Sequence, residues 1–333
     1  MYKISKTLHR IDWIYSKYGS TESKSLEDFI DAVNNAYYSA SANLYSSRFV
    51  EDISDEYKKM FTSIEIKSEP AKRFIVDIGG GAGFEYELLK KCSIDFRHFK
   101  YIEPSKDMMN VFMGSSDVAT DPKLSFHNEH FSEVVDQIRD EPNKLLIINS
   151  ALHHVIWIEP MLDDIKSSMK DGDLFVLGHE PNNDYSRVFM TLQKVFRAVL
   201  TSVLLKKILP QSESSGADKD RWKDINIALL ESQHIKREMS PLLIRRIIDY
   251  GVGYKKDWKK LNVPEEFDEG FWNTEDLSSY LGPDFSLLYF QTYRHLGDSH
   301  GNVVIECMNR ILSTVLKRHG TNFIAVWVKN PRH

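Results

Sequence analysis

The most informative segment of this chain is a run of glycines that joins a short apolar strand to a helix. The apolar segment is 74–78, and four glycines follow within five residues, at Gly79, Gly80, Gly81 and Gly83. Glycine at such a turn lets the backbone approach a ligand without a Cβ clash. Ligands of open α/β sheets bind at the carboxyl ends of strands. The turn therefore predicts an α/β fold with a ligand site at this position.

The spacing of the glycines separates two classes of nucleotide-binding protein. The dinucleotide pattern G-x-G-x-x-G places Phe84 or Tyr86 where its third glycine belongs, and the Gly-Lys-Ser/Thr of phosphate-binding loops is absent. Asp77 stands two residues before the first glycine, and Glu103 ends the next strand. A carboxylate there can accept both hydrogens of a ribose diol. A nucleoside without a pyrophosphate is favoured, and a nicotinamide oxidoreductase is a disfavoured alternative.

Strand and helix patterns alternate five times from the glycine turn onward. The expected strands are 74–78, 98–103, 124–128, 144–149 and 173–178, which predicts a parallel sheet with helices on both faces. Two last strands, 285–293 and 323–329, enclose a helical pattern at 303–318 and complete seven strands. Helical patterns alone fill 1–70 and 185–272. We expect a helical N-terminal cap (1–70), a core (71–184 and 273–333) and a helical insert after the fifth strand (185–272), the cap and insert forming a lid.

Composition disfavours several classes of partner. The net charge of −5 disfavours binding to nucleic acid through phosphates, which usually requires a basic surplus. The two cysteines, Cys92 and Cys307, are too few for a disulfide framework and suit a reducing cytoplasm. The most apolar run, 188–209, contains five lysine, arginine or glutamine residues, so no membrane span is expected.

Four motifs in order resemble those of the class I, Rossmann-like S-adenosylmethionine (SAM)-dependent methyltransferases. Val76-Asp-Ile-Gly-Gly-Gly-Ala-Gly resembles the first motif of this family, and Tyr101-Ile-Glu-Pro-Ser resembles the second. Ala151-Leu-His-His-Val is similar to the fourth motif of small-molecule members, and Gly172-Asp-Leu-Phe-Val-Leu-Gly to the fifth. The resemblance covers 71–184 and, less clearly, 274–330. It implies a seven-stranded, mostly parallel Rossmann-like sheet and SAM as the cofactor.

The resemblance also implies roles for individual residues. Asp77 lies beneath the turn near the methionine end of SAM, and Glu103 holds the ribose. Glu129 meets the adenine amine, although a solvated loop acid is a nearly equal alternative for that residue. Tyr45 or Arg48 is expected to reach the SAM carboxylate. The other implied cofactor-binding residues are Gly79, Gly80, Gly81, Gly83, Pro104, Phe131, Asn149 and Ser150.

Histidine is the natural general base near pH 7, and three histidines follow strands at the expected ligand edge. They are His153, His154 and His179; the alternative for each is a hydrogen bond that shapes its loop. Glu180 can orient a base or substrate, or cap the next helix. The segment 149–152 carries no acidic metal ligand, so no metal is expected, and it lacks the prolines and aromatic residue that base-amine methylation of nucleic acid requires.

The acceptor site is expected to be hydrophobic or aromatic. Its candidate residues are Tyr38, Tyr45, His154, Trp157, Glu180 and Tyr185, and core packing is the alternative for the aromatic ones. The leading hypothesis is a metal-free methyltransferase for an oxygen or nitrogen of a small molecule. A SAM-dependent cyclase or rearrangement enzyme and a non-catalytic SAM-binding protein remain alternatives, and the long insert leaves homodimerisation open.

Overall fold

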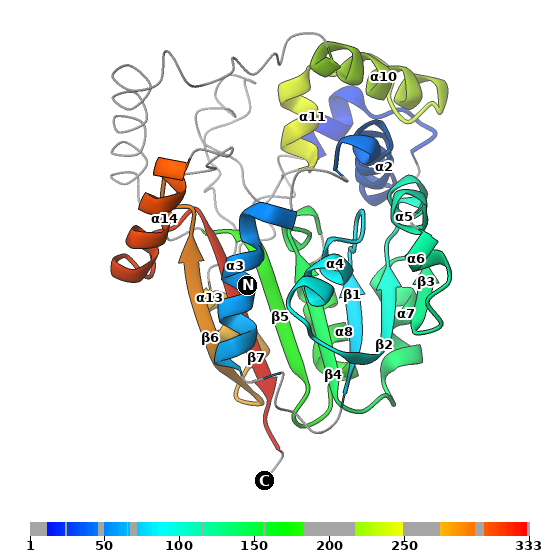
Figure 1. Ribbon diagram of the computed structural model, residues 1–333. Helices are drawn as coiled ribbons and strands as arrows, with labels where there is room; N and C mark the ends of the chain where they lie inside the picture. The colour runs from blue at the N-terminus through cyan, green and yellow to red at the C-terminus, as the bar shows by residue number, and fades with distance from the viewer. Residues whose placement is uncertain are drawn as a thin grey trace.

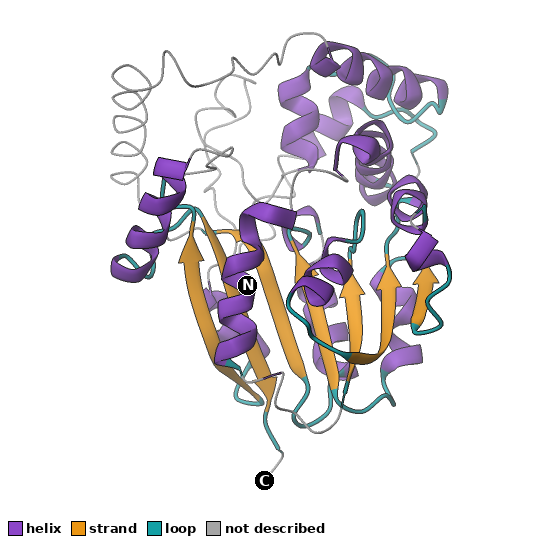
Figure 2. Ribbon diagram, in the orientation of Figure 1, coloured by secondary structure: helices purple, strands orange, loops and turns teal. Residues whose placement is uncertain are grey.

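The computed structural model describes residues 12–23, 25–45, 50–64, 66, 72–114, 116–155, 158–182, 217–248, 274–296 and 303–331. A twisted seven-stranded sheet forms the centre of the molecule (Figures 1 and 2). Its strands are β1 (Arg73–Ile78), β2 (Phe96–Ile102), β3 (Leu124–His127), β4 (Lys144–Asn149), β5 (Leu174–Pro181), β6 (Phe285–Tyr293) and β7 (Asn322–Lys329).

The strand order is β3-β2-β1-β4-β5-β7-β6. The first five strands are parallel to their neighbours, whereas β7 is antiparallel to both β5 and β6. The dinucleotide-binding order, 3-2-1-4-5-6, has no such antiparallel insertion. The order reverses between β1 and β4, and ligands of open sheets bind at such a switch point. The predicted Rossmann-like, mostly parallel seven-stranded sheet is confirmed.

Two hydrophobic cores lie on opposite faces of the sheet because successive strand residues point to opposite sides. Val76 and Ile148 belong to one core, and Ile75 and Ile147 to the other. The first core includes residues of α7 (Phe131–Ile138), α8 (Ile158–Ser168) and α13 (Thr274–Leu281). The second includes residues of α3 (Val50–Ser63), α4 (Phe84–Lys91) and α5 (Lys106–Met113). The remaining core-domain helices are α6 (Ser116–Ala119), the short 3-10 helix η2 (Leu152–His154) and α14 (Val303–Val315).

A third core joins the two helical segments outside the sheet. It contains residues of α2 (Leu26–Tyr45) and of α10 (Ala217–Glu231) and α11 (Pro241–Ile248), which lie above the carboxyl ends of the strands in Figure 1. Phe29 from α2 and Ile225 from α10 are fully buried in it. In contrast, α3 packs on the sheet, so only part of segment 1–70 belongs to this cap.

Among the described residues, no helix combines the length and apolar character needed to cross a bilayer. The apolar run 188–209 lies outside the described residues.

Candidate functional site

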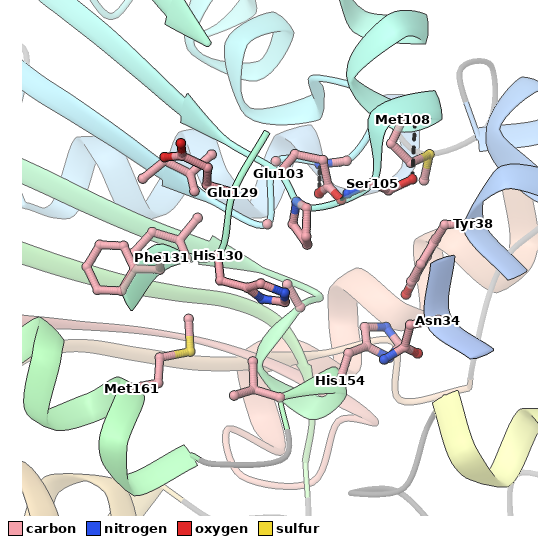
Figure 3. A pocket seen from close by; sticks show the side chains of 18 of the residues that line it. Asn34, Tyr38, Glu103, Ser105, Met108, Glu129, His130, Phe131, His154 and Met161 are labelled. Carbon is pink, nitrogen blue, oxygen red and sulfur yellow. Dashed lines mark hydrogen bonds between the residues drawn. The ribbon is translucent and has the colours of Figure 1, made fainter. Parts of the chain in front are cut away.

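A cavity of about 590 Å³ lies at the carboxyl edge of the sheet, beneath α2 (Figure 3). This volume is within the usual range for small-molecule sites, roughly 300–1,000 Å³. The ends of β1, β2, β4 and β5 contribute to its wall. The wall includes the predicted residues Gly79, Gly80, Gly81, Glu103, Pro104, Glu129, Phe131, Asn149, Ser150, His154, His179 and Tyr38.

The glycine turn forms the floor of the cavity between β1 and α4. Gly81 has a φ of +53°, and a Cβ added there would meet nothing closer than the Met108 Cε atom at 4.0 Å. Gly80 is required for a different reason, because a Cβ there would lie 2.5 Å from Asp77 Oδ2. Gly83 packs against the Phe112 ring and is not part of the cavity wall. The turn therefore presents bare backbone to the cavity.

The Glu103 carboxylate holds the turn in place from the end of β2. Its Oε2 accepts a hydrogen bond from the Gly81 amide at 2.9 Å, and its Oε1 accepts one from the Ser105 amide at 2.8 Å. Burial raises the pKa of Glu103, and the two amide hydrogen bonds act in the opposite direction. A carboxylate has about four lone-pair positions, so Glu103 can still accept hydrogen bonds from a ligand.

Two further carboxyl groups lie behind the turn. Asp77 is 1% exposed, and Glu85, at the start of α4, is 2% exposed and contributes to the cavity wall. Within the described residues, neither Asp77 oxygen accepts a hydrogen bond from an amide or hydroxyl group. Burial raises the pKa of Asp77 well above its usual range and that of Glu85 to about 8. The sequence pattern gave no indication of Glu85, because its position in α4 resembles that of a solvated helix residue.

Glu180 shapes the loop that follows β4. Its Oε1 accepts hydrogen bonds from the Ala151 and Leu152 amides at 2.9 and 2.8 Å, and its Oε2 from the His153 amide at 3.3 Å and ring Nδ1 at 2.9 Å. Its side chain is fully buried, and neither Glu180 nor His153 is part of the cavity wall. The structure thus places Glu180 beneath the loop, away from the predicted acceptor site.

His154 reaches the cavity from η2 and faces α2. Its Nδ1 lies 2.7 Å from the Ile248 carbonyl oxygen, so this nitrogen carries the proton and Nε2 is the basic nitrogen of the neutral ring. Burial, followed by the neighbouring His153, lowers the pKa of His154 well below its usual range. The Tyr38 ring meets the His154 ring edge-on at 5.6 Å.

His179 occupies a bulge in β5 and has a φ of +53°. Its Nδ1 lies 2.7 Å from the Tyr293 hydroxyl and its Nε2 lies 3.2 Å from the Arg294 guanidinium. Burial and then Arg294 lower the pKa of His179 well below its usual range. Because the guanidinium can only donate, the basic nitrogen of His179 is engaged by Arg294.

The outer wall contains residues that the sequence did not single out. Asn34 projects from α2 toward His154, and its Oδ1 is buried without a hydrogen-bond partner among the described residues (Figure 3). Met161, from α8, also lines the cavity. An asparagine within an amphipathic helix gives no distinctive sequence signal.

Some predicted residues cannot be placed in the site. The backbone of Tyr45 ends α2, but its side chain is not described, and Arg48, Trp157 and Tyr185 lie outside the described residues. No group of three or more His, Cys, Asp or Glu side chains in the described ranges is arranged to hold a metal ion. The absence of a metal stays a prediction.

No protein-family model and no curated protein matches this chain. Among solved structures, it is similar to a SAM-dependent methyltransferase from Anabaena variabilis ATCC 29413, at 13% identity and a TM-score of 0.47 over 91% of this chain and 95% of that one. It is also similar to the plantazolicin methyltransferase BamL, solved with a triazolic desmethylPZN analog and SAH, at 12% identity and a TM-score of 0.43 over 92% and 100%. A SAM-dependent methyltransferase from Archaeoglobus fulgidus is 14% identical, with a TM-score of 0.37 over 83% and 94%.

Proposed function

We propose that this chain is a SAM-dependent methyltransferase that acts on an oxygen or nitrogen atom of a small molecule. The observation that carries the proposal is the Glu103 carboxylate at the cavity wall, held by the Gly81 and Ser105 amides. Its remaining lone pairs suit the two hydroxyls of a ribose. The bare turn beside it can contact the rest of a nucleoside.

When bound, SAM supplies a methyl group on a sulfonium for in-line displacement. The residues of this chain then serve to hold and align, since holding two reactants in near-attack geometry can supply much of the rate enhancement. Gly81 and Glu103 fix the nucleoside, while Glu129 and Phe131 line the part of the cavity assigned to the base. Asn149 and Ser150 border the methionine end. The cap helix α2 excludes water from above.

His154 is our candidate for the general base. Its Nδ1–H bond to the Ile248 carbonyl fixes the tautomer, so that Nε2 is the nitrogen able to take a proton. Burial holds the pKa of His154 well below its usual range, so the ring is neutral at pH 7. Glu180 acts through the loop: it holds the backbone from Ala151 to His153 and thereby sets the position of His154. His153, bound to Glu180, is a positioning residue in this proposal.

The acceptor would lie between α2 and the loop after β4. Tyr38, Asn34 and Met161 line this side of the cavity and offer both apolar surface and a hydrogen-bonding amide. The net charge of −5 supports a small molecule over nucleic acid as the acceptor. We also propose that the insert 185–272 joins the N-terminal cap as a lid, supported by the core that α2 shares with α10. A cytoplasmic location and a homodimer stay predictions.

Calorimetry with S-adenosylhomocysteine (SAH), the demethylated product of SAM, and with NAD tests the ligand class. We expect SAH to bind and NAD not to bind. Glu103→Ala should weaken SAH binding by about 1–3 kcal/mol, the size of a lost charge-assisted hydrogen bond. Glu87→Ala, an exposed residue of α4, is the matched control and should bind as the parent does. Binding of NAD in preference to SAH would overturn the proposal. Mass gain of one methyl group on the acceptor separates methyl transfer from cyclisation or rearrangement.

A further inference from the structure

The His154 ring is held by helices of the cap as well as by its own loop. Its Nδ1 lies 2.7 Å from the main-chain carbonyl oxygen of Ile248, the last residue of α11 and 94 positions away along the chain. The Tyr38 ring of α2 meets it edge-on at 5.6 Å, and the His153 ring lies 3.8 Å away between ring centres. The candidate base therefore lies where the sheet and the cap meet.

The position of Ile248 in α11 makes its carbonyl a suitable hydrogen-bond acceptor. The last four carbonyl groups of a helix have no partner within the helix, and they form the negative end of the helix dipole. Ile247 and Ile248 are buried in the core that α11 shares with α2 and α10. The Arg245 guanidinium lies 5.2 Å from the centre of the Trp222 ring of α10. Packing within the cap thus fixes the end of α11.

The two neighbouring histidines are anchored from opposite bodies. His153 Nδ1 lies 2.9 Å from the carboxylate of Glu180 in the sheet, whereas His154 Nδ1 pairs with a carbonyl group of the insert. Because a carbonyl oxygen can only accept, it selects the His154 tautomer that is protonated at Nδ1. A neutral histidine side chain in water favours the other tautomer, which is protonated at Nε2. The position of the His154 proton therefore depends on a contact from the insert.

We propose that the main-chain carbonyl of Ile248 is a positioning group of the active site, through which α11 sets the tautomer of His154. The inference rests on the proposed function, which assigns His154 as the base. With α11 in place, Nε2 accepts the proton that the acceptor atom loses as it gains the methyl group. The imidazolium keeps its Nδ1–H bond to the carbonyl, at the negative end of the helix dipole. Without this contact the ring returns toward the Nε2-protonated form, which cannot accept a proton at that nitrogen. The insert thus contributes to proton transfer and does more than cover the cavity.

Nitrogen-15 NMR of histidine-labelled protein measures the tautomer, because protonated and unprotonated ring nitrogens of a neutral imidazole have well-separated shifts. His154→Gln assigns the resonances through their loss. In the ligand-free parent at pH 7 we expect a neutral His154 ring with its proton on Nδ1. Ile248→Ala removes buried packing at the end of α11 and should shift the tautomer ratio toward Nε2–H roughly ten-fold, the effect of one weakened hydrogen bond. Ile248→Val, which keeps a branched side chain, should stay close to the parent.

Leu229→Ala is the matched control for a loosened cap. Leu229 of α10 is as buried as Ile248 and belongs to the same core, but it is not part of the helix that contacts His154. Its truncation should lower the free energy of unfolding about as much as Ile248→Ala does, as measured in urea. The His154 tautomer should nevertheless remain that of the parent.

The remaining outcomes separate this inference from the proposed function. A parent protein with the His154 proton on Nε2 would contradict the inference, whether or not the variants fold. Equal shifts in Ile248→Ala and Leu229→Ala would also overturn it, because the tautomer would then respond to any loosening of the cap. Calorimetry with SAH tests the ligand class independently, and Ile248→Ala should bind SAH as the parent does. A parent that fails to bind SAH would overturn the proposed function, while the NMR measurement would still decide the role of Ile248.

Discussion

Single buried carboxylates determine the shape of this site, and Glu180 shows how. Its two oxygens accept hydrogen bonds from three backbone amides and from one imidazole nitrogen, and its side chain is fully buried. We predict that Glu180→Gln lowers the free energy of unfolding by about 3–5 kcal/mol. The NH2 group of the new glutamine would face backbone N–H groups that also donate, so hydrogen bonds would be lost in a buried site. Urea unfolding measures the loss. Glu159→Gln, at a partly exposed position in α8, should cost much less; equal losses would contradict this account.

Glu85 carries a second prediction at this scale, about stability and pH. Burial raises its pKa from the ordinary value of 4.5 to about 8. Because the folded state favours the neutral form, the stabilising contribution is fully present below pH 4.5 and is lost as the pH rises through about 8. The melting temperature of ligand-free Glu85→Gln should therefore rise relative to the parent across this window. A difference that stays constant from pH 5 to pH 9 would contradict the raised pKa.

The sequence predicts some residues of the site and misses others, and the difference has a physical reason. The glycine turn and Glu103 follow from local rules, since a ligand-bearing turn requires glycines and an acid at the next strand end. Glu85 and Glu180 do not, because the role of a buried carboxyl depends on which distant backbone and side chains face it. The position of Glu180 after the expected strand 173–178 suggests contact with a base or substrate; in the structure β5 extends to Pro181, and the Glu180 carboxylate accepts hydrogen bonds from three amides of the β4 loop.

At the scale of elements, the cap depends on packing between segments far apart in the chain. Phe29 of α2 is fully buried in the core shared with α10 and α11. We predict that Phe29→Ala lowers the free energy of unfolding by about 3–5 kcal/mol and speeds hydrogen exchange in both α2 and α10. Ile227→Ala, at an exposed position of α10, is the control. Faster exchange in α2 alone would show that the two helices are not one cooperative unit.

Periodicity identified most elements correctly but could not show which helices pack together. The five βα repeats predict the parallel sheet because each strand is apolar and each following helix is amphipathic. The sequence pattern also predicts that segment 1–70 is helical, but it does not show that its helices belong to two different cores. In the structure α3 packs on the sheet with Tyr57 fully buried, whereas α2 packs with the helices of the insert. Partner choice between helices is decided by contacts hundreds of residues apart, which no local pattern records.

At the scale of the whole molecule, the cavity lies between two bodies that the ligand would join. The sheet supplies the floor, and α2 supplies Asn34 and Tyr38 to the wall. Direct contacts between these bodies include the His154 Nδ1 bond to the carbonyl oxygen of Ile248 in α11, at 2.7 Å, and a looser ion pair: His130 Nε2 lies 3.7 Å from Asp31 Oδ2, and both of these side chains are at least one-third exposed. An ion pair of this exposure contributes little to stability. A ligand in the cavity would add contacts of its own between the sheet and α2, because residues of both line the wall.

A ligand that contacts both bodies must stabilise both, and this gives the last prediction. At a hundred-fold excess over its dissociation constant, SAH should raise the free energy of unfolding by about 2.7 kcal/mol. Hydrogen exchange should slow in the glycine turn and, because α2 forms part of the wall, in α2 and the α10 helix packed on it. Glu103→Ala at the same SAH concentration should show a smaller effect in all three segments. Slower exchange confined to the turn would mean that the ligand binds the sheet alone, and α2 would then have no part in closing the site.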